Sequence, residues 1–195
     1  MTTKIAKCVS VIGHPLLTIP IFVVSVLFHF QDFKSALSTS VLIVLGIIVP
    51  LIIKMYWGKK NGVYANFDVS DQGERKSWYF FAIVLLSFTV IIIFATSKSH
   101  LVRVGFLLSV LLLFSSQVVN YYIKCSLHVS FNVFLSFLIV PINLYFAALL
   151  FLFVVVIAWS RVYLRRHTIK EVTIGAILGT VFGLLLKLQF DHHFF

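Results

Sequence analysis

Three short polar segments interrupt an otherwise apolar chain, and their side chains are of the types that bind phosphate groups. The first polar segment is residues 68–76 (DVSDQGERK), the second is residues 124–128 (KCSLH) and the third is residues 160–171 (SRVYLRRHTIKE). Arginine offers a fork of N–H donors that matches two phosphate oxygens at once. The groups suited to phosphate in these segments are Arg75, Lys124, Ser126, His128, Arg161 and His167.

The elements that position these segments are strongly apolar. The chain has 195 residues, of which 61% are hydrophobic and 11% are charged, whereas a soluble domain carries roughly 25% charged residues. Its mean hydropathy is +1.06. Several stretches run for about 18 or more residues with few charges, which is the length that a helix needs to cross a bilayer. We therefore expect an all-α, multi-span transmembrane helical bundle that forms a single domain over residues 1–195.

Seven apolar segments make up the predicted bundle. They cover residues 16–30, 36–55, 78–95, 101–122, 129–140, 144–160 and 169–188. The stretch from Val129 to Trp159 has no charge, but Pro141 and Asn143 interrupt it. Proline breaks a helix interior and disfavours helix at the residue before it, so two short helices are expected there. The first apolar segment is short and either crosses or lies in the interface, so six or seven membrane helices are expected.

The order of the apolar segments predicts where the polar ones lie. Two apolar segments separate the first polar segment from the second, and two more separate the second from the third. An even number of crossings returns the chain to the same side of a membrane, so the three polar segments should meet at one face. The last apolar segment carries Gly175, Gly179 and Gly183, a repeat of small residues that lets helices approach closely. We expect this repeat to serve packing.

The third polar segment resembles a motif of the type 2 phosphatidic acid phosphatase superfamily. That motif reads Ser-Arg, five residues and His, and it is matched by Ser160, Arg161 and His167. The family usually has Asp four residues after this His, and Glu171 holds that place. A glycine-bearing membrane helix then follows, as in the family.

The other two polar segments resemble the remaining motifs of this superfamily less closely. In the second segment, Ser126 and His128 match the motif Pro-Ser-Gly-His, and in the first segment Arg75 fits the Arg of a Lys-to-Arg-Pro motif. The motif Pro and Gly of the second segment, and the Pro and Lys of the first, are replaced by Cys125, Leu127, Lys76 and Asp68.

The resemblance implies a phosphatase-like core in residues 56–188, preceded by N-terminal helices in residues 1–55. In that family the matching His attacks phosphorus, so His167 would become a phosphohistidine. Glu171, one helical turn on, would orient the ring of His167, and His128 would protonate the leaving group. The implied phosphate ligands are Arg75, Arg161, Ser126 and Lys124. The implied substrate is a lipid phosphate or lipid diphosphate, and the scheme requires no metal or cofactor.

The same residues also fit less specific interpretations. The alternative function is a non-catalytic protein that binds or transports lipid phosphates on the same scaffold. The positive-inside rule explains several basic residues without a site, and capping of the next helix explains the acidic ones. These residues are Arg165, Arg166, Lys170, Asp68, Asp71 and Glu74. His14 lies at the end of an apolar segment and is expected among lipid headgroups.

The net charge of +10 indicates membrane topology or binding of phosphate headgroups. No nucleic-acid-binding motif is present, so the expected partners are membrane lipids and a lipid phosphate, and nucleic acid is not among them. If all seven apolar segments cross, most of the 16 Lys and Arg fall on the side of the polar segments. We therefore expect the cell (inner) membrane, with the site on its cytoplasmic face if the first apolar segment crosses. If that segment lies in the interface, the two sides carry similar numbers of basic residues and the charge count does not decide the face.

Overall fold

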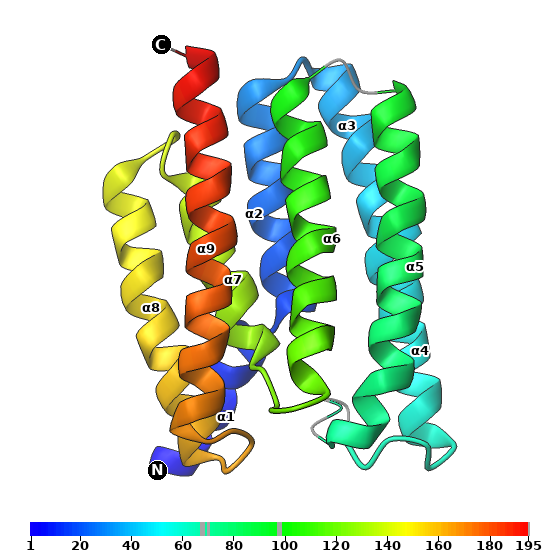
Figure 1. The fold of residues 1–195 in the computed structure, drawn as a ribbon, viewed down its shortest axis with the longest axis vertical. Coiled ribbons are helices and arrows are strands. Elements are labelled where there is room, and N and C mark those ends of the chain that lie inside the picture. Colours follow the sequence, from blue (N-terminus) through cyan, green and yellow to red (C-terminus); the bar gives the residue numbers. More distant parts are fainter. Residues whose placement is uncertain (67–68, 70, 97–98, 195) are drawn as a thin grey trace.

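The described part of the chain forms a bundle of helices. The computed structural model describes residues 1–66, 69, 71–96 and 99–194. The elements are α1 (Thr2–Ile12), α2 (Pro15–Phe30), α3 (Phe33–Ile43), a π-helical turn η1 (Val44–Ile48), α4 (Val49–Lys60), α5 (Gln72–Thr96), α6 (His100–Asn120), α7 (Leu127–Ile139), α8 (Leu144–Tyr163) and α9 (Ile169–Phe194). No strand occurs among these residues, and the predicted all-α bundle is confirmed (Figure 1).

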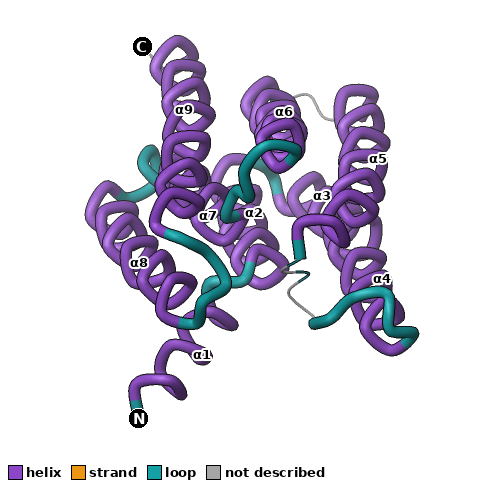
Figure 2. Tube along the Cα trace, turned by 60° about the horizontal axis from the view of Figure 1, so that its bottom comes forward, coloured by secondary structure: helices purple, strands orange, loops and turns teal. Residues whose placement is uncertain are grey.

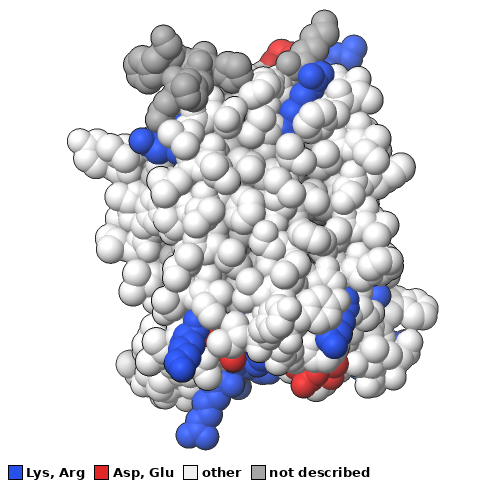
Figure 3. Space-filling model, in the orientation of Figure 1, with Lys and Arg blue, Asp and Glu red and all other residues white. Residues whose placement is uncertain are grey.

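Within the described ranges, five helices are long and apolar enough to cross a membrane: the continuous rod α3–η1–α4, and α5, α6, α8 and α9. Helices α1 and α2 together are long enough for a sixth span, but they are bent by 47° at their break. Lys and Arg lie at the two ends of the molecule in the view of Figure 3, with an uncharged belt between them. The protein is therefore a multi-pass integral membrane protein.

The fifth apolar segment is a short inner helix instead of a full span. Helix α7 has 13 residues, or about 20 Å at 1.5 Å per residue, against a hydrocarbon core of roughly 30 Å. Every residue of α7 except Phe137 is buried, because α2, α8 and α9 pack around it. The predicted division of residues 129–159 is confirmed, since α7 and α8 are separate helices on either side of Pro141.

The three polar segments meet at one end of the bundle, as predicted. The turns after α4, α6 and α8 lie at the end that holds the N-terminus, and the C-terminus lies at the other end (Figure 1). Figure 2 brings this end forward and shows its loops side by side. The Gln72 side chain donates to the Asn120 carbonyl at 2.6 Å, which joins the start of α5 to the end of α6.

The polar loop between α4 and α5 is shorter than predicted, because α5 begins at Gln72 and not at Trp78. Asp71 caps α5, since its Oδ1 accepts from the N–H of Gly73 at 2.8 Å and from that of Glu74 at 3.1 Å. These two bonds lower the pKa of the Asp71 carboxyl. The predicted capping role is confirmed for Asp71, whereas Asp68 lies outside the described residues.

Helix α1 was not expected from the sequence, and the break after it sets the position of α2. Pro15 occupies the first turn of α2, where its missing N–H costs little, and the His14 side chain accepts from the Leu16 N–H at 3.2 Å. A Cβ at Gly13 would lie 2.6 Å from the Ile157 side chain of α8, so glycine lets this turn pack closely on α8. The amphipathic α1 therefore packs on α8. The break after α1 places the His14 ring against His128 of α7.

Proline also explains the π-helical turn inside the second span. Pro50 lacks the N–H that would continue the α-helical hydrogen bonds, and the chain accommodates it with η1, which precedes α4. Ile47 and Ile48 of this turn face the interior and are buried.

The glycine repeat of α9 packs against α7, as predicted. A Cβ on Gly175 would lie 2.7 Å from the Ser126 carbonyl oxygen, and one on Gly179 would lie 2.8 Å from Val133 Cβ and clash with the Ser130 carbonyl. Gly183 faces the Phe137 ring in the same way. The backbone of α9 therefore lies directly against α7, and this contact fixes the start of α7 next to the third polar segment.

This packing predicts that Gly179→Ala destabilises the protein by about 1–3 kcal/mol, the usual cost of overpacking a filled core. The measurement is thermal unfolding of the purified protein in detergent. Gly105→Ala is the matched control, because the nearest heavy atom to a Cβ on Gly105 is 4.0 Å away. Equal unfolding midpoints for the two variants would show that α7 and α9 are not in this close contact.

Candidate active site

His167 and Glu171 form a pair at the start of α9. Thr168 and Glu171 make a capping box: the Glu171 N–H donates to Thr168 Oγ1 at 3.3 Å, and the Thr168 N–H donates to Glu171 Oε2 at 3.3 Å. The same Oε2 lies 2.7 Å from His167 Nδ1. The cap that starts the helix therefore also orients the carboxylate on the imidazole, as the spacing of four residues predicted.

The turn before His167 is strained. Leu164 is the C-cap of α8, and the N–H groups of Arg166 and His167 both donate to the Arg161 carbonyl, at 3.0 and 3.2 Å. Arg165 takes the left-handed conformation, with φ of 54°, where glycine is usual and another residue costs roughly 1–2 kcal/mol. Backbone strain of this kind is concentrated at functional sites.

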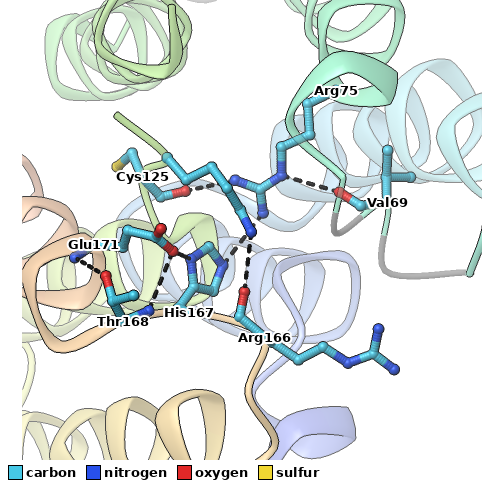
Figure 4. A network of polar contacts seen from close by, with 8 residues as sticks. Val69, Arg75, Cys125, Arg166, His167, Thr168 and Glu171 are labelled. Carbon is cyan, nitrogen blue, oxygen red and sulfur yellow. Dashed lines mark hydrogen bonds and ion pairs between the residues drawn. The ribbon is translucent and has the colours of Figure 1, made fainter. Parts of the chain in front are cut away.

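Arg75 connects all three polar segments. Its Nε donates to the Val69 carbonyl at 3.0 Å, its Nη1 donates to the Cys125 carbonyl at 2.7 Å, and its Nη2 lies 3.4 Å from His167 Nε2 (Figure 4). Arg75 is buried, with 3% of its surface exposed. Val69 has φ of 45°, which is strained for a β-branched residue. That conformation presents the Val69 carbonyl to the guanidinium.

The two neighbours of the His167 ring select the same tautomer. Arginine has only donors and an ionised carboxylate has only acceptors. Nε2 therefore accepts from Arg75, and Nδ1 carries the proton that is donated to Glu171. The resulting neutral ring has its lone pair on Nε2, which is the nitrogen that faces Arg75.

The second polar segment contributes main-chain and side-chain groups. The Ser126 N–H donates to the Glu171 carbonyl at 3.3 Å. Ser126 Oγ is fully buried and has no hydrogen-bond partner among the described residues, so it is free to donate a hydrogen bond to a ligand. Lys124 Nζ donates to the Arg166 carbonyl at 3.4 Å. Burial raises the pKa of the Cys125 thiol to about 11, so Cys125 stays protonated at neutral pH and is no nucleophile.

His128 and Arg161 contact the N-terminal helices. The His128 ring stands edge-on to His14, with centroids 4.8 Å apart, and Asn132 Nδ2 donates to the carbonyls of both His128 and Gly13, at 2.6 and 2.9 Å. Arg161 is fully buried and its Nη1 donates to Ser10 Oγ at 2.7 Å. Sequence reasoning missed this contribution. His14 contacts a candidate catalytic histidine, and no motif spacing links it to the polar segments.

A surface hollow of about 250 Å³ opens beside His167. The lining residues are Lys124, Val162, Arg165, Arg166, His167, Thr168 and Glu171. Three of these are cationic, so the hollow attracts an anion toward the ring. Direct side-chain contacts join Arg75, His167 and Glu171, whereas Arg161 reaches this group through its carbonyl.

Comparison with known proteins adds no family to these observations. No family model matches the chain, and no curated protein and no solved structure matches it either. The resemblance of the three polar segments to the phosphatase motifs therefore remains a prediction from the sequence.

Proposed function

We propose that the chain is a membrane-embedded phosphatase that hydrolyses a lipid phosphate or lipid diphosphate, with His167 as the nucleophile. The observation that carries the proposal is the row Glu171–His167–Arg75, in which Nδ1 lies 2.7 Å from the carboxylate and Nε2 lies 3.4 Å from the guanidinium. A nucleophile needs an orienting group, and a developing phosphoryl charge needs a fixed cation. This row supplies both beside a cationic hollow.

In the first step, the substrate phosphate displaces Arg75 Nη2 from its contact with His167 Nε2, and the Nε2 lone pair then attacks phosphorus. The P–N bond forms, and the P–O bond to the lipid breaks with its electron pair on the leaving oxygen. His128 gives that oxygen a proton, so the lipid leaves as an alcohol, or as a monophosphate when the substrate is a diphosphate. Glu171 stabilises the positive charge on the phosphorylated ring through the Nδ1–H bond.

In the second step, water attacks the phosphohistidine. The deprotonated His128 takes a proton from the water, the new P–O bond forms, and the P–N electron pair returns to Nε2. The sum consumes one water and releases the dephosphorylated lipid and inorganic phosphate. Arg75 and Arg161 serve as phosphate ligands together with Ser126 and Lys124, and such fixed charges supply most of the catalysis in phosphoryl transfer.

A second candidate is a non-catalytic protein that binds or transports lipid phosphates. The observation that favours it is Leu127, which stands where the resembled motif has glycine. A side chain there keeps a phosphate further from the backbone than glycine does. Under this alternative the protein binds alkyl phosphates, and no phosphate is released.

The phosphatase proposal predicts different losses for the two histidines. His167→Ala abolishes release of phosphate from both dodecyl phosphate and para-nitrophenyl phosphate, because nothing replaces the nucleophile. His128→Ala loses about 10²- to 10⁴-fold on dodecyl phosphate. It keeps slow release of phosphate from para-nitrophenyl phosphate, whose leaving group needs little protonation, because only the attack of water on the phosphohistidine is then impaired. The measurement is phosphate release in detergent, with His29→Ala at the far end of α2 as the control. Undiminished turnover by His167→Ala would remove the scheme.

We also propose that the site faces the cytoplasm of a cell (inner) membrane. The end of the bundle that carries the three polar segments also carries the N-terminus and most of the Lys and Arg, and positive loops face the cytoplasm.

This sidedness predicts that Asn66→Cys, at the site end, reacts with a membrane-impermeant maleimide only after intact cells are permeabilised. Lys34→Cys, at the other end, reacts without permeabilisation. Both variants carry Cys8→Ser. Cys125 does not react with the maleimide, because it is buried and its pKa is raised to about 11. The reverse labelling pattern would place the site outside the cell.

A further inference from the structure

An apolar cavity of about 120 Å³ lies inside the bundle between α2, the α3–η1–α4 rod, α5, α6 and α7. One end is lined by the ionisable side chains of His14, Arg75 and His128. The remaining wall is almost wholly aliphatic and aromatic. A cavity lined in this way excludes water and favours an apolar occupant.

The cavity extends along helix α2. Its lining follows α2 from Pro15, beside the site, to Phe30 at the opposite end. That helix has 16 residues, or about 24 Å at 1.5 Å per residue. The far end is lined by Leu101 in the first turn of α6 and by Leu138 near the end of α7. The cavity is therefore elongated, with its polar end at the candidate site and its apolar end on the opposite side of the bundle.

The polar end of the cavity joins the candidate active site. Arg75 lines the cavity and also lies 3.4 Å from His167 Nε2. His128, the candidate acid, lines it as well. A phosphate bound by Arg75 at His167 would therefore lie at the polar end of this apolar cavity, the end that His128 also lines.

We propose that this cavity binds the one hydrocarbon chain of a single-chain lipid phosphate, such as an alkyl or isoprenoid phosphate. This inference rests on the proposed function for the position of the phosphate. The N-terminal helices supply one wall through residues such as Val23, Val26 and Ile47. Together with Leu101 and Gly105 of α6, they would set the length of chain that the cavity accepts. One chain occupies the cavity in this proposal, so the second chain of a diacyl lipid would lie outside it.

Gly105 allows the depth of the cavity to be changed. It lines the cavity five residues into α6, near the far end, and the nearest heavy atom to a Cβ there is 4.0 Å away. Gly105→Leu therefore adds a side chain to the deep part of the channel without a backbone clash. Gly46→Leu is the matched control, since Gly46 is a glycine of a membrane span that does not line the cavity.

The test compares octyl, dodecyl and octadecyl phosphate as substrates in detergent. Gly105→Leu lowers kcat/KM for octadecyl phosphate by at least about tenfold, the penalty for keeping roughly two methylene groups out of the cavity, and leaves octyl phosphate unchanged. Gly46→Leu keeps the parent ratio, and diacyl phosphatidic acid is a poorer substrate than octadecyl phosphate. Equal effects of Gly105→Leu on short and long chains, or faster hydrolysis of the diacyl lipid, would overturn the proposal.

A binding arm separates this inference from the proposed function. Trp78 lines the cavity, and in a Trp57→Phe, Trp159→Phe background it is the only tryptophan. An octadecyl phosphate brominated along its chain quenches Trp78 fluorescence, and Gly105→Leu weakens that quenching, whether or not the protein turns over. Quenching without phosphate release would reject the phosphatase and keep the cavity. Phosphate release without quenching would reject the cavity and keep the phosphatase.

Discussion

The buried guanidinium of Arg75 is the interaction on which the site depends. It binds one carbonyl from the first polar segment, one carbonyl from the second and the imidazole of the third. An ion removed from water to this extent is tolerated only when its donors are satisfied, and removal of one partner from a buried charged contact typically costs about 3–5 kcal/mol. The strained conformation of Val69 persists because its carbonyl serves this guanidinium. Three loops that are distant in sequence are thereby held together.

Helix packing supplies the rest of the rigidity. The glycines of α9 bring its backbone against α7, and the Ser126 N–H bonds to the Glu171 carbonyl across that contact. The capping box of α9 then aims the Glu171 carboxylate at His167. Elements that are needed for folding, a helix cap and a helix–helix contact, therefore also orient the candidate nucleophile. Groups held in this way need no reorganisation during a reaction, which is the main source of electrostatic catalysis.

Much of the arrangement could be predicted from the sequence. Apolar segment lengths predicted the bundle, Pro141 predicted two helices in one uncharged stretch, and the even number of segments predicted that the polar residues meet at one end. The spacing of His167 and Glu171 predicted their contact. Each of these follows from local periodicity or from a count along the chain.

The features that could not be predicted depend on contacts between distant parts of the chain. Nothing in the sequence links Ser10 to Arg161 or His14 to His128, because such contacts arise from the fold of α1 against α8 and of α2 against α7. The short length of α7 follows from its burial on all sides. The apolar cavity likewise depends on five helices together. In the sequence, the residues that line it cannot be distinguished from residues of a filled core.

The most direct test of the account is to trap the phosphorylated residue. His128→Ala slows attack by water, so the covalent intermediate should accumulate when this variant is mixed with radiolabelled para-nitrophenyl phosphate. The account predicts label on His167 that survives alkali and is lost in acid, which is the behaviour of phosphohistidine. It predicts no label on the double variant His128→Ala, His167→Ala. Turnover without label on His167, or label that persists in the double variant, would contradict it.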